Sequence, residues 1–169
     1  MTKDEIFTQL RTAKTAHLQW LSDALALISG LATEHEHVPI AHTDCEFGKW
    51  YYGAGRKLSS LSAYRAIEAP HELLHRTYTQ IFEILFAYDH RPLLSKLVLS
   101  SGRLNKKRRQ EADALMQNLL SVSRTLLESM ALLEQEVLSA TDQALRSLPA
   151  DNPEQGQEIA VFRQRSAAK

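Results

Sequence analysis

The sequence contains few of the residues that cross-link or interrupt a fold. Its 169 residues include one cysteine, five prolines and six glycines. A single cysteine excludes an internal disulfide, so the cysteine content either fits a reducing compartment or carries no information, and we expect a cytoplasmic protein by default. The long stretches between the prolines are rich in good helix formers such as leucine, alanine, glutamate, glutamine and lysine.

Net charge and long apolar runs are also absent. The 20 acidic and 20 basic residues cancel, so no overall field attracts nucleic acid or an anionic membrane. No apolar run approaches the roughly 20 residues that span a bilayer. The polar start "MTKDE" also lacks the apolar segment of a secretory signal. We therefore expect an ordinary globular chain with neither a membrane nor a nucleic-acid partner.

Apolar residues recur at helical spacing through most of the chain. In the segment 3–31 they follow one another every three or four positions, which predicts a long helix with one apolar stripe. The members of this stripe are Ile6, Leu10, Ala13, His17, Trp20, Ala24, Leu27 and Leu31.

The same pattern predicts four further helices. Their expected ranges are about 58–68, 70–88, 92–100 and 105–147. Pro70 suits the first position of its helix because its missing N–H costs nothing there, and Gly102 is expected to end the third of these helices. The seam of the last helix consists of Leu115, Leu119, Val122, Leu126, Met130, Leu133 and Val137.

No run of residues alternates like a strand. We therefore expect an all-α fold, an antiparallel four-helix bundle with short additional helices and a long C-terminal helix. The bundle should occupy residues 1–147, and the polar segment 148–169 should form a flexible tail.

The single cysteine lies in the aromatic stretch "HTDCEFGKWYYGAG". Within it, "TDCE" fits a capping box in which Thr43 is the N-cap and Glu46 reaches back to it. Cys45 would then lie in the first turn of a short helix that Gly53 and Gly55 end, where the helix dipole favours a thiolate. A small buried hydrophobe is the alternative role for this thiol, and capping alone slightly favours it.

Three histidines occupy core-facing positions of the predicted helices. His71 and His75 are four residues apart and share one face, while His17 lies on the stripe of the first helix. A buried imidazole needs a hydrogen-bond partner or a metal. With Cys45 they supply one thiolate and three imidazoles, which suits tetrahedral zinc better than calcium, magnesium or a di-iron site. Four protein ligands leave no position for a catalytic water.

Three motifs carry a family resemblance. "AHLQW" at 16–20, "CEFGKWYYG" at 45–53 and "PHELLH" at 70–75 resemble the chemoreceptor zinc-binding domain family. Its pattern is an early histidine, then C-x-F-G-x-W, then H-x-x-x-H. The resemblance extends over about 5–135.

The resemblance implies a cytosolic four-helix bundle, commonly dimeric, that accompanies bacterial chemoreceptors or diguanylate cyclases. Family members are implicated in sensing zinc, and some in sensing oxidants such as hypochlorous acid through the zinc-bound cysteine. The family pattern implies one zinc ion per chain. Its ligands would be His17, Cys45, His71 and His75.

We therefore expect a non-enzymatic regulatory or sensory module that responds to zinc, with oxidation of Cys45 as a candidate second signal. It would modulate an output of the chemotaxis or cyclic-di-GMP type as a homodimer with a signalling partner. The sequence contains neither a methyl-accepting helix pair nor a cyclase domain, so the output stays open. The alternatives are a metalloenzyme with an open metal position, using Glu46 or Glu72 as general base, and a structural or adaptor bundle.

Aromatic residues flank the predicted ligands, and we expect them to form core and shell around the metal. They are Trp20, Phe47, Trp50 and Tyr51. Gly48 should permit close approach of another helix.

Two further clusters have plainer interpretations. His35, His37 and His42 crowd one segment, where a solvated loop is preferred to a second metal site. The basic run "NKKRRQ" at 105–110 is expected to form a solvated helix face rather than a contact with an acidic partner.

Overall fold

The computed structural model describes residues 2–29, 38–86 and 102–147, and no strand occurs among them. The predicted all-α class is therefore confirmed for these residues. The helices are α1 (Lys3–Ile28), α2 (Glu46–Tyr52), the 3₁₀ helix η2 (Ala54–Leu58), α3 (Ser62–Arg65), α4 (Glu68–Phe86), α6 (Gly102–Ser139) and α7 (Asp142–Arg146).

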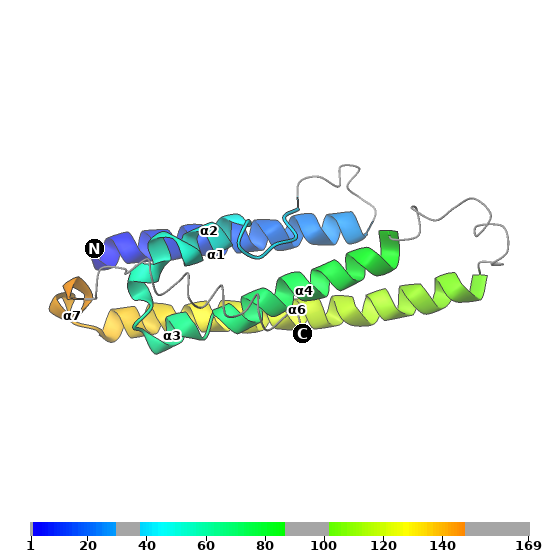
Figure 1. Cartoon of the computed structure of the whole chain (residues 1–169). Helices are drawn as coiled ribbons and strands as arrows, with labels where there is room; N and C mark the ends of the chain where they lie inside the picture. Colours follow the sequence, from blue (N-terminus) through cyan, green and yellow to red (C-terminus); the bar gives the residue numbers. More distant parts are fainter. Residues whose placement is uncertain (1, 30–37, 87–101, 148–169) are drawn as a thin grey trace, which may run out of the picture.

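Three of these helices are long and lie lengthwise along one another. Figure 1 shows α4 and α6 side by side and running in opposite directions. Helix α1 lies lengthwise along this pair, and α2 lies against α1. Helix α1 also contacts both α4 and α6, and α3 contacts α6. The antiparallel four-helix bundle itself stays a prediction, because α2 has only seven residues.

The start of α1 contains a capping box. The Thr2 hydroxyl accepts a hydrogen bond from the Glu5 N–H at 3.2 Å, and the Glu5 carboxylate accepts one from the Thr2 N–H at 2.9 Å. The helix ends at Ile28, three residues before the predicted end, and Leu31 lies outside the described residues. The seven other residues of the predicted stripe are all buried, as expected.

The single helix predicted over 58–68 is wrong. The chain instead forms η2 and then the one-turn helix α3. The N–H groups of Ser62 and Ala63 at the start of α3 donate to the Glu136 carboxylate of α6, at 3.2 and 2.8 Å. Since this cap comes from a residue more than 70 positions away, a local sequence pattern could not indicate it.

Helix α4 starts at Glu68, so Pro70 is its third residue rather than its first. This earlier start costs no hydrogen bond, because the first four N–H groups of a helix have no partner within the helix. Residues 87 and 88, the predicted end of this helix, lie outside the described residues.

The last predicted helix is interrupted. Helix α6 ends at Ser139, and Thr141 caps a separate helix α7 by accepting a hydrogen bond from the Ala144 N–H at 3.1 Å. Gly102, the expected end of a preceding helix, is instead the first residue of α6. The helix predicted at 92–100 and the tail at 148–169 lie outside the described residues.

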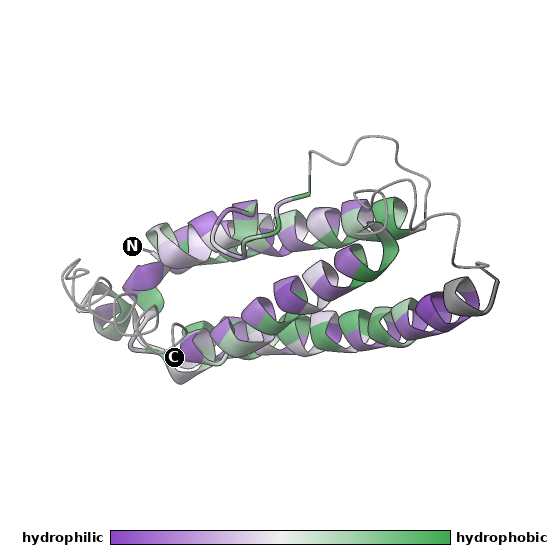
Figure 2. Ribbon diagram, turned by 45° about the vertical axis from the view of Figure 1, so that its right-hand side comes forward, coloured by the Kyte–Doolittle hydropathy of each residue, from purple (hydrophilic) through white to green (hydrophobic). Residues whose placement is uncertain are grey.

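Each long helix carries hydrophobic and hydrophilic residues side by side along its length (Figure 2). Every residue of the predicted seam of α6 is buried except Leu115, which is half-buried, and Ala112, Ser123 and Ser129 are buried beside them. At the start of α6, Lys106, Lys107 and Arg109 are exposed, as a solvated face requires. None of the helices in the described ranges is long and apolar enough to cross a membrane.

Candidate metal centre

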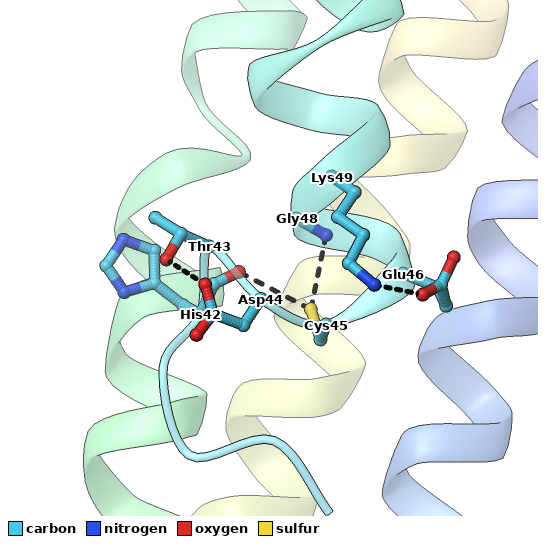
Figure 3. A network of polar contacts seen from close by, with 7 residues as sticks. All are labelled: His42, Thr43, Asp44, Cys45, Glu46, Gly48 and Lys49. Atoms are coloured by element: carbon cyan, nitrogen blue, oxygen red, sulfur yellow. Dashed lines mark hydrogen bonds and ion pairs between the residues drawn. The ribbon is translucent and has the colours of Figure 1, made fainter.

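Cys45 is the N-cap residue of α2. Its Sγ accepts a hydrogen bond from the Gly48 N–H at 3.2 Å and lies 3.4 Å from the His42 carbonyl oxygen (Figure 3). The capping box predicted around it is wrong. Thr43 hydrogen-bonds Asp44, and the Glu46 carboxylate instead pairs with the Lys49 ammonium group (Figure 3). The helix does end at Gly53, as predicted.

Gly48 allows the loop backbone to lie directly against α2. A Cβ atom at this position would lie 1.9 Å from the His42 carbonyl oxygen. At that distance the two atoms overlap, so the loop backbone would have to move. The predicted close approach therefore exists, but it is made by the preceding loop and not by another helix. The same carbonyl oxygen contacts the Cys45 sulfur, so this packing also positions the thiol.

Helix α4 supplies two buried imidazoles. His71 and His75 lie one turn apart with ring centroids separated by 5.0 Å. Cys45 meets them from the start of α2, and its Sγ lies 3.3 Å from His71 Nε2. One donor atom from each of Cys45, His71 and His75 lies within 4.8 Å of the others. The structure thus brings together three of the four residues that the sequence singles out.

The fourth residue, His17, is buried on α1 but does not belong to this group. Its Nε2 atom lies 3.0 Å from the Ser123 hydroxyl of α6, and its ring meets Phe47 edge-on at a centroid distance of 6.2 Å. Ser123 is a contact that the sequence analysis missed, and nothing in the spacing of the motifs indicates it.

His42 lies closer to the cluster than the sequence interpretation as a solvated loop predicts. It is half-buried, and its ring centroid is 5.8 Å from that of His71 and 6.4 Å from that of His75. Its position three residues before Cys45 is the one signal that could have indicated this. Figure 3 shows its ring on the side of the loop away from the Cys45 sulfur. His35 and His37 lie outside the described residues.

A loop carbonyl and an aromatic ring fix the orientation of His75. Its Nδ1 lies 3.0 Å from the Ile40 carbonyl oxygen, which leaves Nε2 to bind another group. Trp20 lies against the His75 ring at a centroid distance of 4.2 Å, and its indole N–H donates to the Pro39 carbonyl oxygen at 3.0 Å. Trp20 therefore holds both the imidazole and the loop that orients it, as the predicted aromatic shell requires.

The rest of this shell anchors α2. Phe47 meets His71 edge-on at 4.7 Å. The rings of Tyr51 and Tyr64 stack at 4.4 Å, and each hydroxyl donates to the backbone carbonyl oxygen of the other residue. Trp50 is half-buried against the core. These contacts join α2 to α3 and α4, so the segment bearing Cys45 is held on several sides.

The donor set and its spacing fit zinc. Zinc binds cysteine sulfur at about 2.3 Å and histidine nitrogen at about 2.0–2.1 Å in a tetrahedron, which places neighbouring ligand atoms about 3.5 Å apart. The Cys45–His71 distance of 3.3 Å is close to that value. His71 Nε2 is the ring nitrogen that faces the sulfur. Its Nδ1 is buried without a hydrogen bond among the described residues, and an ion bound through Nε2 would leave that N–H unpaired. A bound zinc ion would supply positive charge to these donors.

Burial keeps the imidazoles neutral and the thiol protonated before metal binds. Desolvation lowers the pKa of His17 and of His75 to about 4. For His71, desolvation and the neighbouring histidines lower the pKa to about 2. Burial raises the pKa of the Cys45 thiol despite hydrogen bonds from the Gly48 and Phe47 N–H groups. The prediction that the helix start favours the thiolate is therefore corrected, because desolvation outweighs it.

The family comparison agrees with the motifs. The model of the chemoreceptor zinc-binding domain family matches residues 17–82, so the resemblance is confirmed for that segment, which is narrower than the 5–135 expected. The matched segment contains all four predicted zinc ligands, one cysteine and three histidines, but it does not extend to α6. The matched family is a zinc-binding domain, and the Cys/His cluster of this chain can bind that ion. No curated protein and no solved structure matches the chain.

We expect Gly48→Ala to lower the unfolding free energy of the metal-free protein by about 1–3 kcal/mol, because the loop backbone must move away from the added methyl group. Urea unfolding followed by circular dichroism measures this loss. Lys49→Ala, at the neighbouring exposed position, serves as the control and should change stability by less than about 1 kcal/mol. Equal effects of the two substitutions would contradict the packing described.

We expect the metal-free protein to lose stability as the pH falls from 7 to 5. The three imidazoles have folded pKa values of about 4 or lower, below the value of about 6.5 in an unfolded chain. The unfolded state therefore binds more protons in this window, and each histidine contributes a slope approaching about 1.4 kcal/mol per pH unit below pH 6.5. Urea unfolding in the presence of a chelator measures the slope. It should become shallower in His75→Ala, and a flat profile in the unsubstituted protein would refute the expectation.

Proposed function

We propose that this chain is a zinc-binding regulatory module that holds one zinc ion on His17, Cys45, His71 and His75. The observation that carries the proposal is the convergence of Cys45, His71 and His75 inside the apolar core. These residues come from two elements, and their donor atoms have the chemistry that tetrahedral zinc prefers.

His17 is the proposed fourth ligand for three reasons. It matches the early histidine of the family pattern, it is almost fully buried on α1, and only one of its ring nitrogens is engaged by Ser123. His42 is the competing candidate, but it is half-buried, and its ring lies on the side of the loop away from the sulfur (Figure 3).

The positions of the proposed ligands support a regulatory role. Zinc on these four residues would join α1, the start of α2 and α4, so loss of the ion would weaken the contacts among three elements. A neutral imidazole and a deprotonated thiol are needed for binding, so the affinity falls at low pH. Oxidation of Cys45 would remove the thiolate ligand. The family match suggests that such a change modulates a bacterial chemotaxis or cyclic-di-GMP output.

A metalloenzyme is the second candidate, because only three donor residues converge in the described structure and a tetrahedral ion would then keep one open position. Of the two carboxylates considered as general base, Glu46 is exposed and pairs with Lys49. Glu72 is half-buried on α4 beside His71. Substitution of the fourth ligand separates the two functions.

We expect the purified protein to contain one zinc ion per chain, measured by elemental analysis. In a chelator competition, Cys45→Ala and His17→Ala should each lower zinc affinity by at least about tenfold, because each removes a direct ligand. His42→Ala is the matched control and should leave the affinity within about threefold of the unsubstituted protein.

The outcomes of this experiment are distinct. Absence of zinc, or an unchanged affinity in Cys45→Ala, would refute the zinc module. If Cys45→Ala loses affinity while both His17→Ala and His42→Ala keep it, the ion has an open position and the metalloenzyme becomes the better proposal.

We further propose that the module is a homodimer that contacts a signalling protein. Support comes from the family resemblance and from α6, which has 38 residues and exposes Leu120, Leu132 and Leu138. Light scattering at micromolar concentration should give twice the chain mass. Leu132→Lys places a charge on the exposed surface of α6 and should shift the mass toward the monomer, whereas Leu18→Lys on α1 is the control. A monomeric mass for the unsubstituted protein would overturn the proposal.

A further inference from the structure

A serine of α6 contacts His17, the proposed fourth ligand of the metal centre. The Ser123 hydroxyl lies 3.0 Å from His17 Nε2, and the two side chains are 3% and 2% exposed. They are 106 positions apart in the chain, and Ser123 lies outside the segment that matches the zinc-binding family. Neither the motifs nor the family match assigns this residue a role.

The contact differs from those of other hydroxyl groups on the same helix. Ser129 donates to the Thr125 carbonyl oxygen at 3.0 Å, and Thr125 donates to the Ser121 carbonyl oxygen at 3.3 Å. Such bonds to the preceding turn are the common way in which a helix satisfies its serines and threonines. Ser123 instead reaches a side chain of another helix.

A histidine that binds a metal through one ring nitrogen almost always donates the N–H of its other nitrogen to a nearby acceptor. The acceptor fixes both the tautomer and the orientation of the ring. His75 already shows half of this arrangement, since its Nδ1 faces the Ile40 carbonyl oxygen and its Nε2 is left for a metal. In His17 the two nitrogens have the opposite roles, because Nε2 is engaged by Ser123 and Nδ1 is left for a metal.

We propose that Ser123 is a positioning residue of the metal centre, which accepts a hydrogen bond from His17 Nε2–H and so directs His17 Nδ1 to zinc. The inference rests on the proposed zinc site. It extends that site from α1, α2 and α4 to α6, the long helix that also contacts α3 and α4. Zinc binding would then strengthen the contact between α1 and α6. The presence or absence of the ion would in this way affect α6.

The first test compares two serine-to-alanine substitutions on one helix. Ser123→Ala should lower zinc affinity by about tenfold in a chelator competition, the lower end of the effect of losing such a partner. Ser129→Ala, which is also buried on α6, should leave the affinity unchanged. Ser123→Thr keeps the hydroxyl and should bind zinc within about threefold of the unsubstituted protein.

The second test reads the tautomer directly. A long-range ¹H–¹⁵N spectrum of the zinc-loaded, unsubstituted protein should show His17 protonated at Nε2 and bound to zinc through Nδ1. This measurement needs no variant, so it decides the matter even if Ser123→Ala fails to fold.

Three results would overturn the inference while leaving the zinc site intact. They are zinc bound through His17 Nε2, an unchanged affinity in Ser123→Ala, and a tighter affinity in that variant, which would mean that Ser123 competes with the metal for His17. Absence of zinc from the unsubstituted protein is a different result, because it refutes the proposed function itself.

Discussion

Three imidazoles and a thiol are buried in one apolar core. The arrangement around them follows from the need to give these polar groups hydrogen-bond partners or a metal ion. Desolvation keeps the imidazoles neutral and raises the pKa of Cys45. The protein satisfies part of this polarity itself, through Ser123, through the Ile40 carbonyl oxygen and through the Gly48 N–H. One donor atom from each of Cys45, His71 and His75 also lies within 4.8 Å of the others. A zinc ion suits them because its charge offsets the cost of burial.

The loop before α2 positions the side chains of the candidate metal centre as much as the helices do. Its carbonyl oxygens at Pro39, Ile40 and His42 contact Trp20, His75 and Cys45, respectively. One short segment thus orients a ligand, the aromatic ring that lies on it and the sulfur. Gly48 permits this segment to lie against α2. Contacts of this kind hold the side chains in place before metal binds, and metal affinity depends on such preorganisation.

Much of the site was predictable because its signals are local. The spacing of His71 and His75 places both on one helical face, and the C-x-F-G-x-W motif identifies Cys45. The apolar stripe of α1 predicted seven buried positions that the structure confirms. Local signals also misled: "TDCE" has the form of a capping box, yet Cys45 caps α2 with its own sulfur. Several alternatives have similar capping energies, so packing decides among them.

The sequence by itself determined the helical class, the stripes that face the core and the types of donor atom, because periodicity and residue chemistry are properties of neighbouring positions. Only the tertiary structure decided which donors converge and what holds them. Ser123 meets His17 across 106 positions, and Glu136 caps α3 across more than 70. Contacts of this kind depend on how helices pack against one another. That packing reflects the shape of the whole core, which no local pattern contains.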